Sequence, residues 1–132
     1  VAPCEKAMLE RRAGARLAWP RIDAEKLNME AMAVDPGGMY AKNRYNILEP
    51  ISGDKVDPAQ IDIIFVPLVI FDARGYRVGY GKGYYDRFLL RCRPEALKVG
   101  FCFFEAIEAI RDIDEFDVPL NLCITPSRVY EF

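Results

Sequence analysis

The chain has 132 residues, the size of one ordinary domain, and 52% of them are hydrophobic, so a sizeable core is possible. Its formal net charge of −2 argues against a nucleic-acid partner, because such proteins usually present a basic face. Histidine is absent, which excludes Ser-His-Asp and Cys-His catalytic groups and imidazole metal sites. No apolar run approaches the roughly 20 residues of a membrane span, so no membrane partner is expected.

The four cysteines favour a reducing compartment. Cys4, Cys92, Cys102 and Cys123 are far apart and none forms a Cys-x-x-Cys pair, so zinc or a redox dithiol has no support. Cys102 and Cys123 lie inside apolar runs and are expected to pack as small hydrophobes. Buried thiols without a disulfide framework, and the lack of an opening signal segment, predict a cytoplasmic protein.

The first sixty residues carry short and mixed patterns of secondary structure. In chain order they predict a helix over 4–13 ended by Gly14, a short strand over 16–19 stopped by Pro20, an ambiguous stretch over 22–34, a turn over 35–38 and a short strand over 45–48. None of these elements carries a strong functional pattern.

The second half has stronger patterns. A β-branched, nearly continuous apolar run over 61–71 predicts a central parallel strand covered on both faces, ending or bulging at Pro67. The following elements are a turn over 72–75, an amphipathic helix over 85–91 with Phe88 and Leu89 inward, a strand over 97–103, a short helix over 105–111, a strand over 120–125 and an edge segment at 129–130. The alternation of strands and helices predicts an α/β fold.

The most informative stretch is 79–86, Gly-Tyr-Gly-Lys-Gly-Tyr-Tyr-Asp. Bare backbone can approach an anion at each glycine, Lys82 supplies positive charge, and the start of a helix supplies further amide donors. The stretch is neither a Walker A motif nor the dinucleotide fingerprint. It therefore predicts a phosphate-binding loop, with a tight turn as the alternative interpretation.

Neighbouring side chains are candidates for the rest of a site. Asp86, in the first turn of the helix, is a candidate magnesium ligand, or else only a helix N-terminal charge. Tyr84 and Tyr85 are adjacent, so one is expected to pack inward while the other faces the site, unless both are core residues. Arg21 can clamp an anion and Asn121 lies at the mouth of a strand, but a surface salt bridge and a turn residue are the ordinary roles.

These residues resemble the signature of a known family. The runs 66–72 and 75–89, with Trp19-Pro20-Arg21-Ile22, Ile47-Leu48-Glu49-Pro50, Val99–Phe103 and Asp117–Thr125, are similar in order and spacing to the 5-formyltetrahydrofolate cyclo-ligases, also called methenyltetrahydrofolate synthetases. The similarity extends over about residues 15 to 130. Its central motif is highly specific.

The resemblance implies an activity. Such enzymes convert 5-formyltetrahydrofolate to 5,10-methenyltetrahydrofolate with ATP and Mg²⁺, releasing ADP and phosphate, and transfer of a phosphoryl group needs charge neutralisation but no histidine. Lys82 and Tyr84 become the candidate catalytic residues, and Asp86 and Asn121 the candidate metal ligands. The candidate ATP-binding residues are Arg77, Val78, Gly79, Tyr80, Gly81, Lys82, Gly83, Tyr84 and Tyr85, of which Tyr80 to Tyr84 also border the folate.

The resemblance also implies a fold, and two departures qualify it. The expected fold is a single domain over 1–132, with three α/β/α layers around an open, mainly parallel sheet, acting as a monomer. An N-terminal helix and strand of the family are expected to be missing, which would expose a sheet edge. Asn121 stands where the family commonly has Asp, and a neutral oxygen binds magnesium more weakly. A non-catalytic relative that binds folate or nucleotide is therefore the alternative.

Overall fold

The computed structural model describes residues 16–33 and 38–132. These residues divide into two compact units, which are described separately: 16–22, 30–33 and 38–56 form the first, and 23–29 and 57–132 form the second. The predicted helix over 4–13 and most of the predicted turn over 35–38 lie outside the described residues. The single domain over 1–132 stays a prediction.

The first unit consists of short antiparallel strands. One sheet has the order β1-β2-β5, formed by β1 (Ala18–Asp23), β2 (Asn28–Ala33) and β5 (Asp54–Val56), while β3 (Tyr40–Lys42) pairs with β4 (Leu48–Pro50). The prediction that Pro20 stops the first strand is wrong, because β1 continues to Asp23. Among the described residues β1 is an edge strand, where a proline is tolerated because one side of the strand has no neighbour that needs its N–H.

The predicted strand over 45–48 is mostly a loop. The Asn43 side chain accepts hydrogen bonds from the Tyr45 and Ile47 amides at 2.8 and 3.2 Å, and Asn46 has a left-handed φ of 61°. An asparagine that bonds the backbone ahead of it favours a turn over a strand, and only Leu48 of this stretch joins β4.

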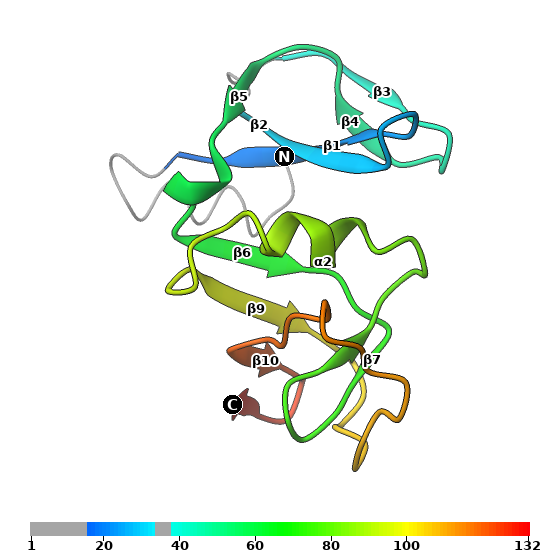
Figure 1. The fold of residues 1–132 in the computed structure, drawn as a ribbon, viewed down its shortest axis with the longest axis vertical. Helices are drawn as coiled ribbons and strands as arrows, with labels where there is room; N and C mark the ends of the chain where they lie inside the picture. The colour runs from blue at the N-terminus through cyan, green and yellow to red at the C-terminus, as the bar shows by residue number, and fades with distance from the viewer. Residues whose placement is uncertain (1–15, 34–37) are drawn as a thin grey trace. The chain divides into compact units, whose positions relative to one another are not determined.

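The second unit is built around a four-stranded mixed sheet with the order β11-β10-β9-β6 (Figure 1). β6 pairs parallel with β9 and β9 parallel with β10, while β10 and β11 are antiparallel. The elements of this unit are η1 (Pro58–Gln60), β6 (Ile63–Val66), β7 (Ile70–Phe71), β8 (Arg77–Val78), α2 (Tyr84–Leu89), β9 (Leu97–Phe101), β10 (Leu122–Ile124) and β11 (Val129–Glu131). The predicted strands over 97–103, 120–125 and 129–130 are thus confirmed, each with one or both ends moved by one or two residues.

The apolar run over 61–71 is the main correction to the predicted sheet. Its strand β6 ends before Pro67, as expected, but β6 lies at the edge of the sheet in the described residues, not at its centre. Ile63 and Phe65 are each 44% exposed, whereas Ile64 and Val66 are buried. The run continues as β7, which pairs antiparallel with β8 outside the main sheet.

Helices are fewer than the sequence pattern predicts. The helix predicted over 85–91 is present as α2, with Phe88 and Leu89 buried. The helix predicted over 105–111 is wrong, since Ile107 lies extended in a parallel bridge with Asp72, and its N–H donates to the Phe71 carbonyl. The part of the chain that the structure describes contains one α-helix, so the three-layer arrangement is not observed there.

The core of the second unit contains Phe71 and Cys123, both fully buried. The Phe71 ring meets the Tyr130 ring edge-on at 4.9 Å between centroids, which fixes β7 against β11. No helix among the described residues has the length and apolar character needed to cross a membrane.

Candidate functional site

The turn that precedes the glycine-rich stretch is organised by Asp72, whose side chain is fully buried. Its Oδ1 accepts from the Arg74 and Tyr76 amides at 2.9 and 3.1 Å, and its Oδ2 accepts from the Ile110 amide at 3.0 Å and from the Arg74 guanidinium at 2.8 Å. Burial opposes ionisation, but these hydrogen bonds outweigh it and lower the pKa of Asp72 below its usual value. The turn is therefore a fixed support for the glycine-rich stretch after it.

The glycine loop, defined as Gly79–Gly83, is open to solvent throughout. A Cβ added at Gly79 or Gly81 would meet no atom within 4 Å. Gly81 and Gly83 have φ of 88° and 69°, left-handed values that residues with a side chain rarely adopt. Lys82 is exposed and forms no ion pair with any described residue. The loop thus combines bare backbone with an uncommitted ammonium group.

Helix α2 begins directly after the loop. Gly83 is its N-cap residue, and it has no side chain to bond the free amides of the first turn. Asp86 supplies a carboxylate in that turn.

Arg87 connects the helix back to the loop. Its Nη2 donates to the Lys82 carbonyl at 2.9 Å, and its guanidinium lies 5.2 Å from the centre of the Tyr84 ring. A Cβ on Gly83 would come within 2.9 Å of Arg87 Nη1. The last glycine of the loop therefore leaves the room that this guanidinium occupies.

The predicted metal ligand Asp86 is engaged with protein groups on one oxygen. Asp86 Oδ1 accepts from Arg77 Nη2 and from the Val118 amide, both at 3.1 Å, while Arg77 Nη1 donates to the Val118 carbonyl at 2.8 Å. The Arg77 side chain is only 4% exposed, and its Nε has no hydrogen-bond partner. The predicted ATP-binding residue Arg77 thus joins the start of α2 to the segment that leads into β10.

Asn121, the second predicted metal ligand, lies between two strands. Its side-chain Oδ1 accepts a hydrogen bond from the backbone N–H of Lys98 at 2.8 Å, and its backbone N–H donates to the Lys98 carbonyl at 2.9 Å. It shares no hydrogen-bond partner with Asp86 in the described residues. No hydrogen-bond network of the described residues therefore links Asp86 with Asn121, the two predicted metal ligands.

The three tyrosines of the site occupy different environments. Tyr84 is buried at the start of α2, Tyr85 is half-buried, and Tyr80 is 74% exposed. Burial raises the pKa of Tyr85, and the positive charge of Arg77 opposes the rise. Tyr84 therefore packs inward, while Tyr85 lines a small hollow of about 300 Å³ with Phe65, Val66, Pro67 and Phe101.

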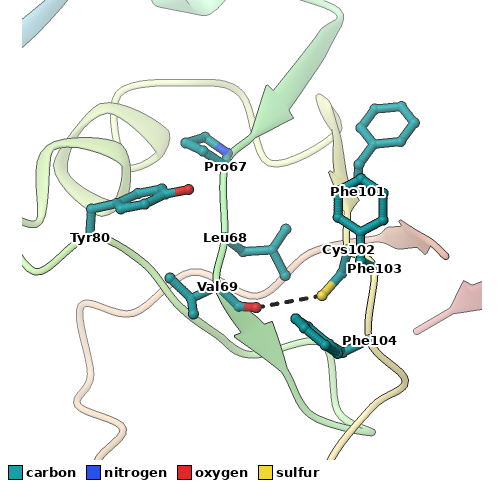
Figure 2. A pocket seen from close by; sticks show the side chains of 8 residues that line it. All are labelled: Pro67, Leu68, Val69, Tyr80, Phe101, Cys102, Phe103 and Phe104. Atoms are coloured by element: carbon teal, nitrogen blue, oxygen red, sulfur yellow. Dashed lines mark hydrogen bonds between the residues drawn. The ribbon is translucent and has the colours of Figure 1, made fainter. Parts of the chain in front are cut away.

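An apolar groove of about 360 Å³ adjoins the glycine loop (Figure 2). Tyr80 lines one side, and the other lining residues are Pro67, Leu68, Val69, Phe101, Cys102, Phe103 and Phe104. Figure 2 shows Tyr80 and the phenylalanines on opposite sides of the Pro67–Val69 backbone, where the Cys102 thiol donates to the Val69 carbonyl at 3.6 Å. The groove follows the carboxyl ends of β6 and β9, the usual ligand position in α/β proteins.

Sequence reasoning assigned no role to Phe103 or Phe104, because the strand was predicted to continue to 103. β9 ends at Phe101, and Phe103 and Phe104 are 88% and 67% exposed. Adjacent aromatic residues directly after a parallel strand are the pattern that could have indicated them.

The described residues thus combine a glycine loop that carries an exposed lysine, a helix directly after it, and an aromatic groove at the carboxyl ends of parallel strands. In α/β proteins such an arrangement is typical of sites for small phosphorylated and planar ligands. The sequence model of the 5-formyltetrahydrofolate cyclo-ligase family matches residues 5–126. The chain belongs to this family.

Individual relatives agree with this assignment. The 5-formyltetrahydrofolate cyclo-ligase of Escherichia coli K12 is 31% identical over 125 residues, which cover 92% of this chain and 69% of that protein. The enzyme of the same name from Mycoplasma genitalium is 34% identical over 73 residues, covering 54% of this chain and 44% of that protein.

Solved structures give the same fold. The NMR structure of Aquifex aeolicus 5,10-methenyltetrahydrofolate synthetase superposes with a TM-score of 0.78 at 32% identity, over 98% of this chain and 63% of that one. The synthetase from Mycoplasma pneumoniae gives a TM-score of 0.66 at 25% identity, over 93% of this chain and 63% of that one. The chain thus spans less than two thirds of each of these solved relatives.

Proposed function

We propose that this chain catalyses the ATP- and magnesium-dependent conversion of 5-formyltetrahydrofolate to 5,10-methenyltetrahydrofolate, releasing ADP and phosphate. The observation that carries the proposal, beyond family membership, is the position of Tyr80. Tyr80 belongs to the glycine loop and also lines the aromatic groove. A phosphate donor on the loop and a planar ring system in the groove would therefore be neighbours, as a reaction between two substrates requires.

The chemistry needs activation of a poor electrophile. The formyl oxygen attacks the γ-phosphorus of ATP and ADP leaves, which gives a phosphorylated iminium carbon. N10 of the folate then attacks that carbon, phosphate departs with the former formyl oxygen, and N10 loses its proton. Both steps build up charge on phosphoryl oxygens, so preorganised positive groups and amide donors contribute most of the catalysis.

Lys82 is the residue to which we assign direct contact with the phosphoryl group, because its ammonium is exposed and has no ion-pair partner among the described residues. The open backbone at Gly79 and Gly81 leaves room for phosphate oxygens. Tyr84, the other predicted catalytic residue, is only 7% exposed. We therefore assign Tyr84 a packing role beneath the Arg87 guanidinium, and we assign binding of the pterin ring to the aromatic residues of the groove.

Magnesium fits Asp86 better than it fits Asn121. Both hydrogen bonds to the Asp86 carboxylate go to Oδ1, so Oδ2 keeps its lone pairs. Mg²⁺ is commonly bound by one or two carboxylates together with substrate phosphates and water, and it neutralises charge on the phosphates when bound. The described residues contain no cluster of three or more acidic, cysteine or histidine side chains, so Asp86 would act with the phosphates. The Asn121 oxygen already accepts from the Lys98 amide, which favours a structural role.

The test is an absorbance assay, because the methenyl product absorbs in the near ultraviolet where the substrate does not. The purified chain with 5-formyltetrahydrofolate, ATP and Mg²⁺ should form product, and omission of ATP or Mg²⁺ should abolish it. The absence of product from a folded chain under saturating substrates would reject the proposal.

A non-catalytic folate- or nucleotide-binding relative is the second candidate. The engagement of Asp86 with Arg77 and the Val118 amide favours it, since a carboxylate held by protein donors is a weaker metal ligand. That candidate predicts ATP binding by calorimetry without product formation.

The proposal also covers the cellular compartment and the oligomeric state of the protein. Cys92, Cys102 and Cys123 are free and buried, which fits a reducing cytoplasm. We also propose a monomer, with the three-layer α/β/α arrangement of the family. Light scattering at high concentration tests the monomer, because a dimeric mass would contradict it.

A further inference from the structure

Arg87 is fixed from three directions within the second unit. Its Nη2 donates to the Lys82 carbonyl at 2.9 Å, and its Nε donates to the Leu27 carbonyl, also at 2.9 Å. Its guanidinium also lies over the ring of Tyr84. A planar guanidinium with two bonded nitrogens and a stacked face has little remaining freedom. Arg87 is therefore a rigid connection between the helix, the loop and the turn that contains Leu27.

The Leu27 end of this connection is itself well defined. Leu27 has a left-handed φ of 51°, which is uncommon for a residue with a side chain. The turn before it is closed by Asp23, whose Oδ1 accepts from the Glu25 and Lys26 amides at 3.2 and 3.1 Å. Arg91, one helical turn after Arg87, donates to the neighbouring Met29 carbonyl at 3.1 Å. The 23–29 turn is thus an anchor for the arginine.

We infer that Arg87 is a positioning residue, which holds the Lys82 carbonyl and thereby keeps the glycine loop in a shape that accepts phosphate. A free carbonyl oxygen directed at phosphate would repel it, whereas an oxygen bonded to a guanidinium is withheld from the ligand. Gly83 is needed for the same arrangement, because a side chain at this position would displace the Arg87 guanidinium. This inference rests on the proposed function for the identity of the ligand, ATP.

The competing account is that Arg87 only stabilises α2 and its packing. The two accounts differ in what a variant changes. Loss of packing lowers the amount of folded protein and therefore kcat, with both KM values unchanged. Loss of positioning weakens binding of the nucleotide more than binding of the folate, because Tyr80 is the one groove residue that belongs to the loop.

The experiment compares Arg87→Met with Arg93→Met in the whole chain. Arg93 is a matched control, because it also donates to a carbonyl, that of Ile61, and pairs with Asp62, but it bonds no residue of the loop. Arg87→Met should raise KM for ATP about tenfold, the loss typical of a hydrogen bond to a charged group, with a smaller change in KM for 5-formyltetrahydrofolate. Hydrogen exchange of peptides over 79–84 should become faster in Arg87→Met and stay unchanged in Arg93→Met. Arg87→Lys should give an intermediate KM for ATP, because an ammonium group keeps the positive charge but cannot donate to two carbonyls in the fixed planar geometry of a guanidinium.

A fall in kcat with both KM values unchanged, or equal exchange in the two methionine variants, would overturn the positioning role. If the wild-type chain proves inactive, a fluorescent ATP analogue replaces the assay. Binding about tenfold weaker in Arg87→Met would then keep the positioning role while the proposed function fails, and equal binding would reject the positioning role as well. Gly83→Ala should imitate Arg87→Met, and the double variant should bind no more weakly than Gly83→Ala alone.

Discussion

Gly75 and the first two glycines of the loop, Gly79 and Gly81, lie within a few residues of each other in the chain, yet their environments are opposite. A Cβ on Gly75 would come within 2.8 Å of the Leu120 carbonyl oxygen and 2.9 Å of the Phe132 ring. A Cβ on Gly79 or Gly81 would meet nothing within 4 Å. The first glycine is required by the packing of the protein, while the others leave space that no protein atom fills.

This difference separates glycines that serve the fold from glycines that serve a ligand. Gly75 belongs to the Asp72 turn, in which five hydrogen bonds converge on one buried carboxylate. The glycine loop follows this turn and makes few bonds of its own. A rigid turn that carries an open loop is a common construction for binding sites, because the support fixes the position of a backbone that must stay accessible.

The largest effect should come from Gly75→Ala. The left-handed φ of 91° and the clash with the Leu120 oxygen together should cost about 4 kcal/mol of unfolding free energy. Gly79→Ala is the matched control and should cost less than about 1 kcal/mol, since the added methyl has room. Urea denaturation measures both. Equal losses would remove the distinction between the two kinds of glycine.

Lys82→Ala should produce the next largest effect, and on activity instead of stability. Removal of one positive group from a developing phosphoryl charge should lower kcat/KM about 100-fold or more, with the urea midpoint unchanged because the side chain is exposed and unpaired. Steady-state kinetics with varied ATP provides the measurement. An unchanged rate would take Lys82 out of the mechanism.

The two candidate metal ligands should respond differently. Asp86→Asn keeps an acceptor for the Val118 amide but loses the charge, so the Mg²⁺ concentration for half-maximal activity should rise about tenfold. Asn121→Ala should leave the Mg²⁺ dependence unchanged and destabilise the fold by about 1–3 kcal/mol, because the Lys98 amide loses its acceptor. A shifted Mg²⁺ titration in Asn121→Ala would restore that residue as a metal ligand.

The smallest effect concerns pH and the Asp72 turn. The pKa of Asp72 is lower in the folded chain than the value of about 3.9 in an unfolded one. The ionised carboxylate therefore contributes stability above pH 4, which is lost as the pH falls through the folded pKa. The difference in unfolding free energy between the wild type and Asp72→Asn should narrow between pH 5 and pH 3. A constant difference would mean that Asp72 contributes no ionisation-linked stability.

The elements that the sequence predicts correctly are those with one clear pattern. Helix α2 follows from its apolar face at Phe88 and Leu89, and β9 and β10 follow from short segments rich in apolar residues. The segment 105–111 has the composition of a helix, but Ile107 is held extended by hydrogen bonds with Phe71 and Ala73, residues far away in the chain. Local preference cannot reveal a partner that distant.

The candidate site likewise has features that the local sequence predicts and features that depend on residues far apart in the chain. The glycine loop could be predicted because glycine, lysine and a helix start are adjacent in sequence. The bonds from Arg87 to Leu27, and from Asp86 to the Val118 amide, join residues 60 and 32 positions apart. Their geometry depends on the folded chain, and so the structural roles of Arg77 and Arg87 could not be deduced from spacing alone.

The most direct test of the central claim is a ¹H–¹⁵N NMR titration of the chain with ATP and Mg²⁺. The amide signals of Gly79, Gly81 and Gly83 should move with increasing nucleotide, because phosphate oxygens would enter the open space beside them. The Gly75 amide should stay fixed, since it donates to the Asp72 carbonyl within the packed turn. Loop signals that do not move at saturating ATP, or shifts confined to other parts of the chain, would contradict the account.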